Sequence, residues 1–418
     1  MNGFMGRRGC ALASTLAALA LAGTAAADPA PSFAQLLRRA AETPRVTALE
    51  ADVAQAEGLA AQGGVRPNPT ISVYGENFSG SSPYGGFGRT ETTLQLNQPI
   101  ELGGKRAARI AAGRASVAAA QASGHAGRLA YAYDLARAYG AAEVAIGRIA
   151  LAQDEVEEAT AILSVARALV SAGKEARLRQ LQAETEVDAM QAMLEQAKAE
   201  SVAALAHLAA LAGSETSWTA LSESLLDRLD ARPRSGPVDP MQEAGYRAAE
   251  ARREAAAQRV TVERTRAVPD LNAQIGVRRL EADNATALVA GVSLPLHVFD
   301  SNRGNIAAAQ AELRAAEARA AAARLEAQAQ ARAAQGLVDA TDRRAAAAKR
   351  TMATAEETYR LARVAYEAGK SPLIELLNAR HGLGAARAVV LDAAAARLEA
   401  RATFARLSGT TITGEPVQ

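Results

Sequence analysis

The chain contains the same pattern twice, with its two copies 196 residues apart. Three turn-forming residues of the first half return at this offset in the second half: Pro99 as Pro295, Gly173 as Gly369, and Gly213 as Gly409. Around the middle pair the match is denser, because Ala172-Gly173-Lys174 returns as Ala368-Gly369-Lys370. Prolines and glycines at one constant offset indicate an internal duplication, and a duplication constrains the fold before any single motif is weighed.

Residues 1–27 have the pattern of a secretory leader. Arg7 and Arg8 precede an apolar stretch from Cys10 to Gly23, and three alanines at 25–27 form a small-residue cleavage site. Cys10 starts the apolar stretch instead of ending it, so we predict no lipid attachment. The mature chain would then contain no thiol, which excludes disulfides, thiolate metal sites and cysteine nucleophiles.

The charge balance and the scattered histidines exclude several classes of function. The chain has 47 basic and 45 acidic residues, and loss of Arg7 and Arg8 leaves 45 of each, so we predict no nucleic-acid partner. We predict no metal site and no cofactor, because the histidines do not pair at ligand spacing: His125, His207, His297 and His381. No catalytic set or phosphate loop is found, so an enzyme is not expected. After residue 27 no apolar run approaches the ~20 residues of a membrane-spanning helix, so any route into a membrane must use strands.

Each half has the same predicted order of elements. The first half has a helix over 33–63, strands over 70–74 and 90–98, a long helix over 104–170 and a return helix over 175–211. The second half has a helix over 241–266, strands over 270–279 and 285–294, a long helix over 305–367 and a return helix over 372–407. We predict Pro372 at the first position of the last helix, where its missing N–H has no cost.

These elements define the predicted domains. Residues 28–213 form a first repeat, 214–240 an irregular link, 241–409 a second repeat and 410–418 a C-terminal tail. The first long helix would extend roughly 100 Å, so it must pack beside other helices, as in a helical barrel. Four strands cannot span a membrane alone because their edges stay unpaired, but a trimer would supply twelve, an even number suited to a barrel. Two solvent-exposed hairpins on a helical domain are the alternative.

Three segments carry a resemblance to a known family. Gln98-Pro99-Ile100-Glu101-Leu102-Gly103-Gly104-Lys105-Arg106 and the segment 294–304 (LPLHVFDSNRG) are similar to the junctions of the CzcC-like, metal-efflux branch of the TolC family of outer-membrane efflux ducts. The segment 366–379 (YEAGKSPLIELLNA) resembles the periplasmic tip of the second repeat in that family. Together with the order of elements, the likeness covers essentially the whole mature chain.

The resemblance implies an α+β, mainly α fold and a homotrimer. Its twelve-stranded β-barrel would lie in the lipid of the cell outer membrane, and its long α-helical barrel would extend into the periplasm. It also implies a tripartite pump with a periplasmic membrane-fusion adaptor protein and an inner-membrane transporter of the proton-driven RND type. The duct would pass heavy-metal cations and do no chemistry itself. A duct for organic solutes or for type I secretion, and a periplasmic coiled-coil adaptor or structural protein, are the alternatives.

The resemblance also assigns roles to individual residues. The adaptor would contact the two tips, at Gly173, Lys174, Gly369, Lys370 and Ser371. The pore entrance would involve Tyr366, Glu375 and Asn378, where Asn378 replaces an acid often found in the family. The strand–helix junctions would contain Pro99, Gly103, Gly104, Pro295, Asn302, Arg303 and Gly304. Helix capping is the alternative for the glycines and lysines, and a solvated helix face is the alternative for Glu375 and Asn378.

Overall fold

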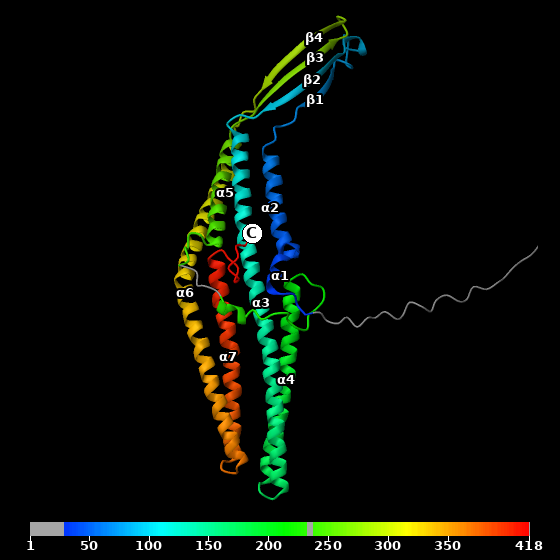
Figure 1. The fold of residues 1–418 in the computed structure, drawn as a ribbon. Helices are drawn as coiled ribbons and strands as arrows, with labels where there is room; N and C mark the ends of the chain where they lie inside the picture. The colour runs from blue at the N-terminus through cyan, green and yellow to red at the C-terminus, as the bar shows by residue number, and fades with distance from the viewer. Residues whose placement is uncertain (1–28, 232–236, 418) are drawn as a thin grey trace, which may run out of the picture.

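The computed structural model describes residues 29–231 and 237–417, so the predicted leader lies outside the described residues. The molecule is elongated, with a β-sheet at one end, two helical hairpins at the other, and the C-terminus near the middle (Figure 1). The duplicated order of elements is confirmed. The first half contains α1 (Phe33–Arg38), α2 (Pro44–Gly63), β1 (Thr70–Glu76), β2 (Glu91–Ile100), α3 (Lys105–Ser171) and α4 (Arg177–Leu211). The second half contains α5 (Ala244–Arg266), β3 (Leu271–Leu280), β4 (Ala285–Ser293), α6 (Arg303–Glu367) and α7 (Leu373–Leu407).

Two proline positions differ from the prediction. The single helix expected over 33–63 is wrong, because a short 3₁₀ turn, η1 (Ala40–Glu42), separates α1 from α2. Pro44 starts α2, and Thr43 before it is extended, since the residue before a proline avoids the helical region. Pro372 precedes α7 with an extended ψ of 154°, so it is the capping residue and not the first helical one.

The link between the repeats is more ordered than predicted. It contains a 3₁₀ helix, η3 (Asp227–Ala231), and the Ala30 N–H donates to the Ala220 carbonyl at 2.8 Å. Its Leu225 is only 2% exposed and packs in the same cluster as Phe33 and Tyr139. Burial among apolar side chains of both repeats, including Leu398 of the second, therefore fixes this segment at the waist of the molecule.

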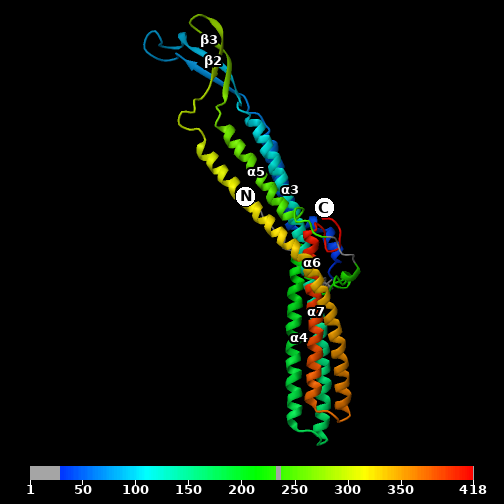
Figure 2. The same cartoon turned by 90° about the vertical axis from the view of Figure 1, so that its left-hand side faces the viewer.

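Helix α3 is the centre of the helical layer. It packs against α2 and α4 on one side and against α5 and α7 on the other, and α6 packs against α5 and α7 beyond them. The layer therefore runs from α2 and α4, through α3, to α5 and α7 and finally α6 (Figures 1 and 2). Small residues allow the close approach: a Cβ on Gly113 of α3 would lie 2.9 Å from the Ala60 Cα of α2. Each outer edge of the layer, at α2 with α4 and at α6, has a free side.

The glycines that marked the duplication share one structural role. Gly173, Gly213, Gly369 and Gly409 each follow the end of a long helix with φ between +69° and +73°. In each case the next residue donates its N–H back into the helix, as Lys174 does to Leu169 and Lys370 does to Ala365, both at 2.9 Å. This is the Schellman ending, which needs a left-handed residue that only glycine adopts without strain.

The four strands form one antiparallel sheet in the order β1-β2-β3-β4. The two halves of the chain meet at its centre, where β2 pairs with β3. Pro99 of β2 lies opposite Asn272 of β3, and β1 has already ended at that level, since its last pair is Thr70 with Asn97. The absence of an N–H at Pro99 therefore leaves the β1 ladder intact. Strands β1 and β4 are the edges of the sheet.

Candidate functional site

The register of the sheet places apolar side chains in rows on one face. One row runs across all four strands through Val73, Leu94, Val277 and Leu288, and the next runs through Ile71, Leu96, Ile275 and Ala290. These side chains are exposed, from 43% for Val277 to 84% for Leu288. An exposed, contiguous apolar face of this kind indicates a surface that contacts either a membrane or another protein.

The opposite face of the sheet carries a polar network. The Gln95 amide donates to Asn97 and to Gln274, both at 2.6 Å. Nearer the far end of the sheet, Arg278 donates to the Thr93 hydroxyl at 2.9 Å and pairs with Glu91 at 2.9 Å. The sheet is thus amphipathic, with one apolar face and one hydrogen-bonded face.

The first strand–helix junction depends on glycine. Gly103 and Gly104 have φ values of +70° and +75°, and Gly104 is the capping residue of α3. A Cβ on Gly103 would lie 2.8 Å from the Val268 side chain. Lys105, the first residue of α3, pairs with Asp270 at 2.7 Å, and Asp270 directly precedes β3. The junction therefore joins the first repeat to the second.

Arg109 of α3 connects the same junction to the end of α2 through hydrogen bonds. Its guanidinium donates to the Glu101 carboxylate at 3.0 Å, to the Gly63 carbonyl at 2.9 Å and to the Val65 carbonyl at 3.1 Å. The hydrogen bond from Arg109 holds the pKa of Glu101 below its usual range. Sequence reasoning placed no role on Arg109 or Asp270, because each acts through partners far away in the sequence.

The second junction uses Asn302 where the first uses Gly104. Asn302 caps α6 with a φ of +58°, and its amide donates to the Glu263 carbonyl at 2.7 Å and to the Glu263 carboxylate at 3.1 Å. Arg303 and Gly304 follow as the first two residues of α6, and both are exposed. Pro295 is exposed just beyond the end of β4. The asparagine thus tolerates the left-handed position and ties α6 to α5.

The predicted tip residues lie at the two ends farthest from the sheet (Figure 1). Gly173, Lys174, Gly369 and Lys370 are exposed, and Ser371 is partly buried. A Cβ on either glycine would meet no atom within 4 Å. Both turns therefore present free surface, and their glycines are required by the backbone conformation alone.

The three predicted pore residues occupy different environments. Tyr366 is 6% exposed and packs with Ile162 of α3 and Leu376 of α7 in one apolar cluster. Its hydroxyl is buried without a hydrogen-bond partner among the described residues. Glu375 and Asn378 lie on the opposite, exposed side of α7. The structure thus brings Glu375 and Asn378 together and separates Tyr366 from them.

A buried arginine near the tips was not found from the sequence. Arg380 of α7 is 3% exposed, forms an ion pair with Glu186 of α4 and donates to the Glu155 carbonyl at 3.4 Å. Burial lowers the pKa of Arg380. The available signal was its position one turn after Leu376, on the buried face of α7. An arginine at such a position predicts an acidic partner, because arginine is rarely buried without one.

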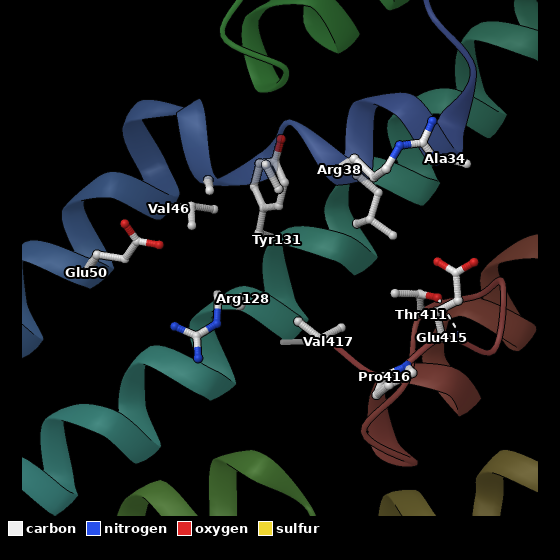
Figure 3. A pocket seen from close by; sticks show the side chains of 13 residues that line it. Ala34, Arg38, Val46, Glu50, Arg128, Tyr131, Thr411, Glu415, Pro416 and Val417 are labelled. Atoms are coloured by element: carbon white, nitrogen blue, oxygen red, sulfur yellow. Dashed lines mark hydrogen bonds between the residues drawn. The ribbon is translucent and has the colours of Figure 1, made fainter.

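A cavity of about 550 Å³ lies at the waist, between α1, α2, α3 and the end of the chain (Figure 3). Val46, Tyr131 and Val417 contribute apolar surface, and Arg128 and Glu50 contribute charge. The Arg128 Nε is buried without a hydrogen-bond partner within the described residues. None of the predicted site residues lines this cavity.

The described residues contain neither a metal-ligand cluster nor a membrane-spanning helix. Over 29–231 and 237–417 no three acidic, histidine or cysteine side chains gather as metal ligands would. In the same ranges, every helix is too short or too polar to cross a membrane.

A duplicated helical layer with a four-stranded amphipathic sheet at one end defines the class of efflux channel proteins. The sequence profile of the outer membrane efflux protein family matches residues 36–214 and 246–410. The chain therefore belongs to this family, which consists of channels and not of enzymes.

Relatives and solved structures agree with this assignment. The chain is 40% identical over 299 residues to the nickel-cobalt-cadmium resistance protein NccC of Alcaligenes xylosoxydans xylosoxydans, covering 70% of this chain and 68% of NccC. It is 32% identical over 289 residues to the cobalt-zinc-cadmium resistance protein CzcC of Cupriavidus metallidurans, covering 68% of this chain and 67% of CzcC. A crystal structure of CusC is similar in fold, with a TM-score of 0.75 at 17% identity over 90% of this chain and 92% of CusC. The predicted resemblance to the CzcC-like branch is confirmed.

Proposed function

We propose that this protein is the outer-membrane exit duct of a tripartite pump that exports divalent heavy-metal cations. Three copies would close into a ring, with the four-stranded sheets in the outer membrane and the helices in the periplasm. A secreted, unlipidated mature chain from Asp28 onward is part of this proposal. The observation that carries it is the amphipathic sheet, whose exposed apolar rows lie on the face opposite its polar network.

The edges of the sheet support the trimer. Among the described residues, strands β1 and β4 have no second neighbouring strand, so their outward N–H and C=O groups have no ladder partner. In lipid such groups must be paired, which requires the β4 edge of one copy to meet the β1 edge of the next. The free sides of α2 with α4 and of α6 allow the helical layer to close in the same way.

Two neighbouring residues on β4 give a matched test of membrane insertion. Leu288 lies in an apolar row, and Val289 lies on the polar face opposite Gly276. We expect Leu288→Lys to destabilise the inserted trimer by roughly 2–4 kcal/mol, the cost of a cation on a lipid-facing strand, and Val289→Lys to be tolerated. Outer-membrane fractionation and chemical crosslinking would measure insertion and trimer content. A wild-type protein found as a soluble periplasmic monomer would overturn the proposal.

The metal substrate is supported by the names of the relatives, NccC and CzcC, which are metal resistance proteins. Cells lacking this protein should lose tolerance to nickel, cobalt, cadmium or zinc salts and keep their tolerance to organic dyes. Plasmid-borne wild-type protein should restore metal tolerance. Loss of dye tolerance with unchanged metal tolerance would favour the duct for organic solutes.

We place the adaptor at the two tips and the transporter beyond it. The tips present exposed Lys174 and Lys370 on turns with open space around them. Because the mature chain would contain no cysteine, Lys174→Cys and Lys370→Cys would be the only thiols available for crosslinking. We expect both to crosslink to an adaptor in intact cells, whereas Arg303→Cys at the other end of α6 should not.

A further inference from the structure

A large cavity lies on one face of the helical layer near the sheet. It has a volume of about 970 Å³ and is lined from α2, α3, α5 and α6. These four helices lie side by side in that order, so α2 and α6 are the outer members of the row. One cavity can contact both outer helices and the two between them only if the row of helices curves around it. The cavity therefore lies on the concave face of the layer. In the proposed ring, the concave face is the one that lines the channel.

Arginines from three helices converge on this cavity. Arg252, Arg259 and Arg266 of α5 are spaced seven residues apart, so they form a stripe along one side of the helix. Arg109 of α3 and Arg319 of α6 line the same cavity. The acids in the lining are fewer: Asp52, Glu263 and Glu312.

The pairing of these groups leaves two arginines free. Arg259 pairs with Glu312 at 3.2 Å, and Arg266 pairs with Glu263 at 2.6 Å. Arg109 is held by Glu101, as described above. Arg252 and Arg319 are exposed and form no ion pair within the described ranges. Two guanidinium groups on the neighbouring helices α5 and α6 are thus available to a ligand.

Helices α3 and α5 carry an excess of positive charge near this cavity, whereas α2 carries three acids against one arginine. Helix α3 carries five cationic residues and no acid before Asp134, and α5 carries six arginines against three glutamates. Helix α4, which runs to the tip, has five acids against three bases. The five arginines of the lining outnumber its three acids, and an excess of one sign of charge on a concave wall concentrates counter-ions there.

We propose that this cavity is a binding site for small multivalent oxyanions of the phosphate and pyrophosphate type. A planar guanidinium forms two parallel hydrogen bonds with such an oxyanion, so Arg252 and Arg319 bind it from α5 and α6. Three copies of the site surround the channel below the membrane. The inference that the site faces the channel rests on the proposed function, whereas the binding itself does not. Bound anions offset the positive charge that an exported cation meets in this section.

The test uses inorganic pyrophosphate on the purified full-length protein in lipid bilayers. We expect pyrophosphate to reduce the single-channel current of the wild type in a concentration-dependent way. The double variant Arg252→Gln with Arg319→Gln should need at least about tenfold more pyrophosphate for half-block, because two charge-assisted hydrogen bonds are lost. The control Arg360→Gln removes an exposed arginine of α6 close to the tip and should leave the block unchanged. Equal block of wild type and double variant would overturn the proposal.

A second measurement separates this proposal from the duct. Calorimetry on the detergent-purified protein measures pyrophosphate binding whether or not the protein conducts current. Binding that is weakened about tenfold in the double variant, and further weakened by added salt, supports the site. Wild-type protein that conducts but binds no pyrophosphate overturns it. Protein that binds pyrophosphate at this site and conducts no current contradicts the duct alone.

Discussion

Arg380 of α7 and Glu186 of α4 form a buried ion pair that joins the second helical hairpin to the first near the tips. The two residues are 194 positions apart in the sequence. The Arg380 side chain is 3% exposed and the Glu186 side chain 18% exposed, so water screens the pair poorly. The pair therefore makes the position of one hairpin depend on the other.

Removing Arg380 should destabilise the protein strongly. Arg380→Met removes the arginine from the largely buried Glu186 carboxylate, which then keeps only the exposed His381 at 3.5 Å among its described pairs, and breaking a buried pair in this way costs about 3–5 kcal/mol. Arg380→Met with Glu186→Met should recover most of that loss, because neither charge remains. Thermal unfolding of the purified protein would measure both. Arg148→Met is the control, since Arg148 joins α3 to Asp392 of α7 at 2.9 Å but is 47% exposed. Equal losses for Arg380 and Arg148 would show that burial of the pair is unimportant.

Replacing Gly369 by valine should abolish export and leave a folded trimer. The backbone at Gly369 has a φ of +69°, and a side chain there meets no atom, so the effect acts on the turn alone. The left-handed position costs a β-branched residue about 1–2 kcal/mol. Gly369→Asn should keep export, because asparagine tolerates this conformation. Gly382→Val adds the same bulk to α7 at a position with open space and should also export. Normal metal tolerance with Gly369→Val would contradict the role of the tip.

Neutralising Glu375 should change the ion preference of the channel entrance. If Glu375 faces the channel, three copies form a ring of carboxylates that attracts cations and binds divalent ions weakly. Glu375→Gln should then lower the cation preference in single-channel recordings and relieve block by divalent ions. The effect should be moderate because Asn378, its neighbour on the same exposed side of α7, is neutral. Unchanged selectivity and block would place Glu375 on the outer face.

Ionised Asp342 should stabilise the second helical hairpin, and this stabilisation should be lost at acid pH. Asp342 of α6 accepts from Arg397 of α7 at 2.6 Å and from Arg401 at 3.2 Å. Burial raises its pKa, but the hydrogen bond from Arg397 and the charge of Arg401 outweigh burial and hold the pKa below its ordinary value of 3.8. A lowered folded-state pKa means that the stabilisation is present above the unfolded value and is lost as the pH falls through the folded value.

Asp342→Asn should therefore lower stability by about 3 kcal/mol at neutral pH, since it removes the carboxylate that two largely buried arginines, Arg397 and Arg401, share. The deficit relative to wild type should shrink as the pH falls below 4. Thermal unfolding between pH 7 and pH 3 would measure it. Glu357→Gln breaks an exposed pair within α6 and should cause no measurable change. A deficit that stays constant with pH would contradict the titration of Asp342.

Several features of the fold follow from local patterns in the sequence. The Schellman turns at Gly173 and Gly369 were predictable because a glycine after a long helical pattern has one common structural reason. The paired strands followed from apolar–polar alternation, and α3 spans 67 residues, from Lys105 to Ser171. The break before Pro44 was missed, although the proline itself was the signal.

By itself, the sequence determined the duplication, the order of the strands and long helices, and the glycines that end those helices, because these depend on neighbours within a few residues. Only the tertiary structure decided which side chains meet across the repeats. The apolar row from Val73 to Leu288 depends on the register of four strands, since a shift of one residue would move each side chain to the other face. The pair of Arg380 with Glu186, and the arginines around the cavity between α2, α3, α5 and α6, likewise depend on packing between helices that no local pattern encodes.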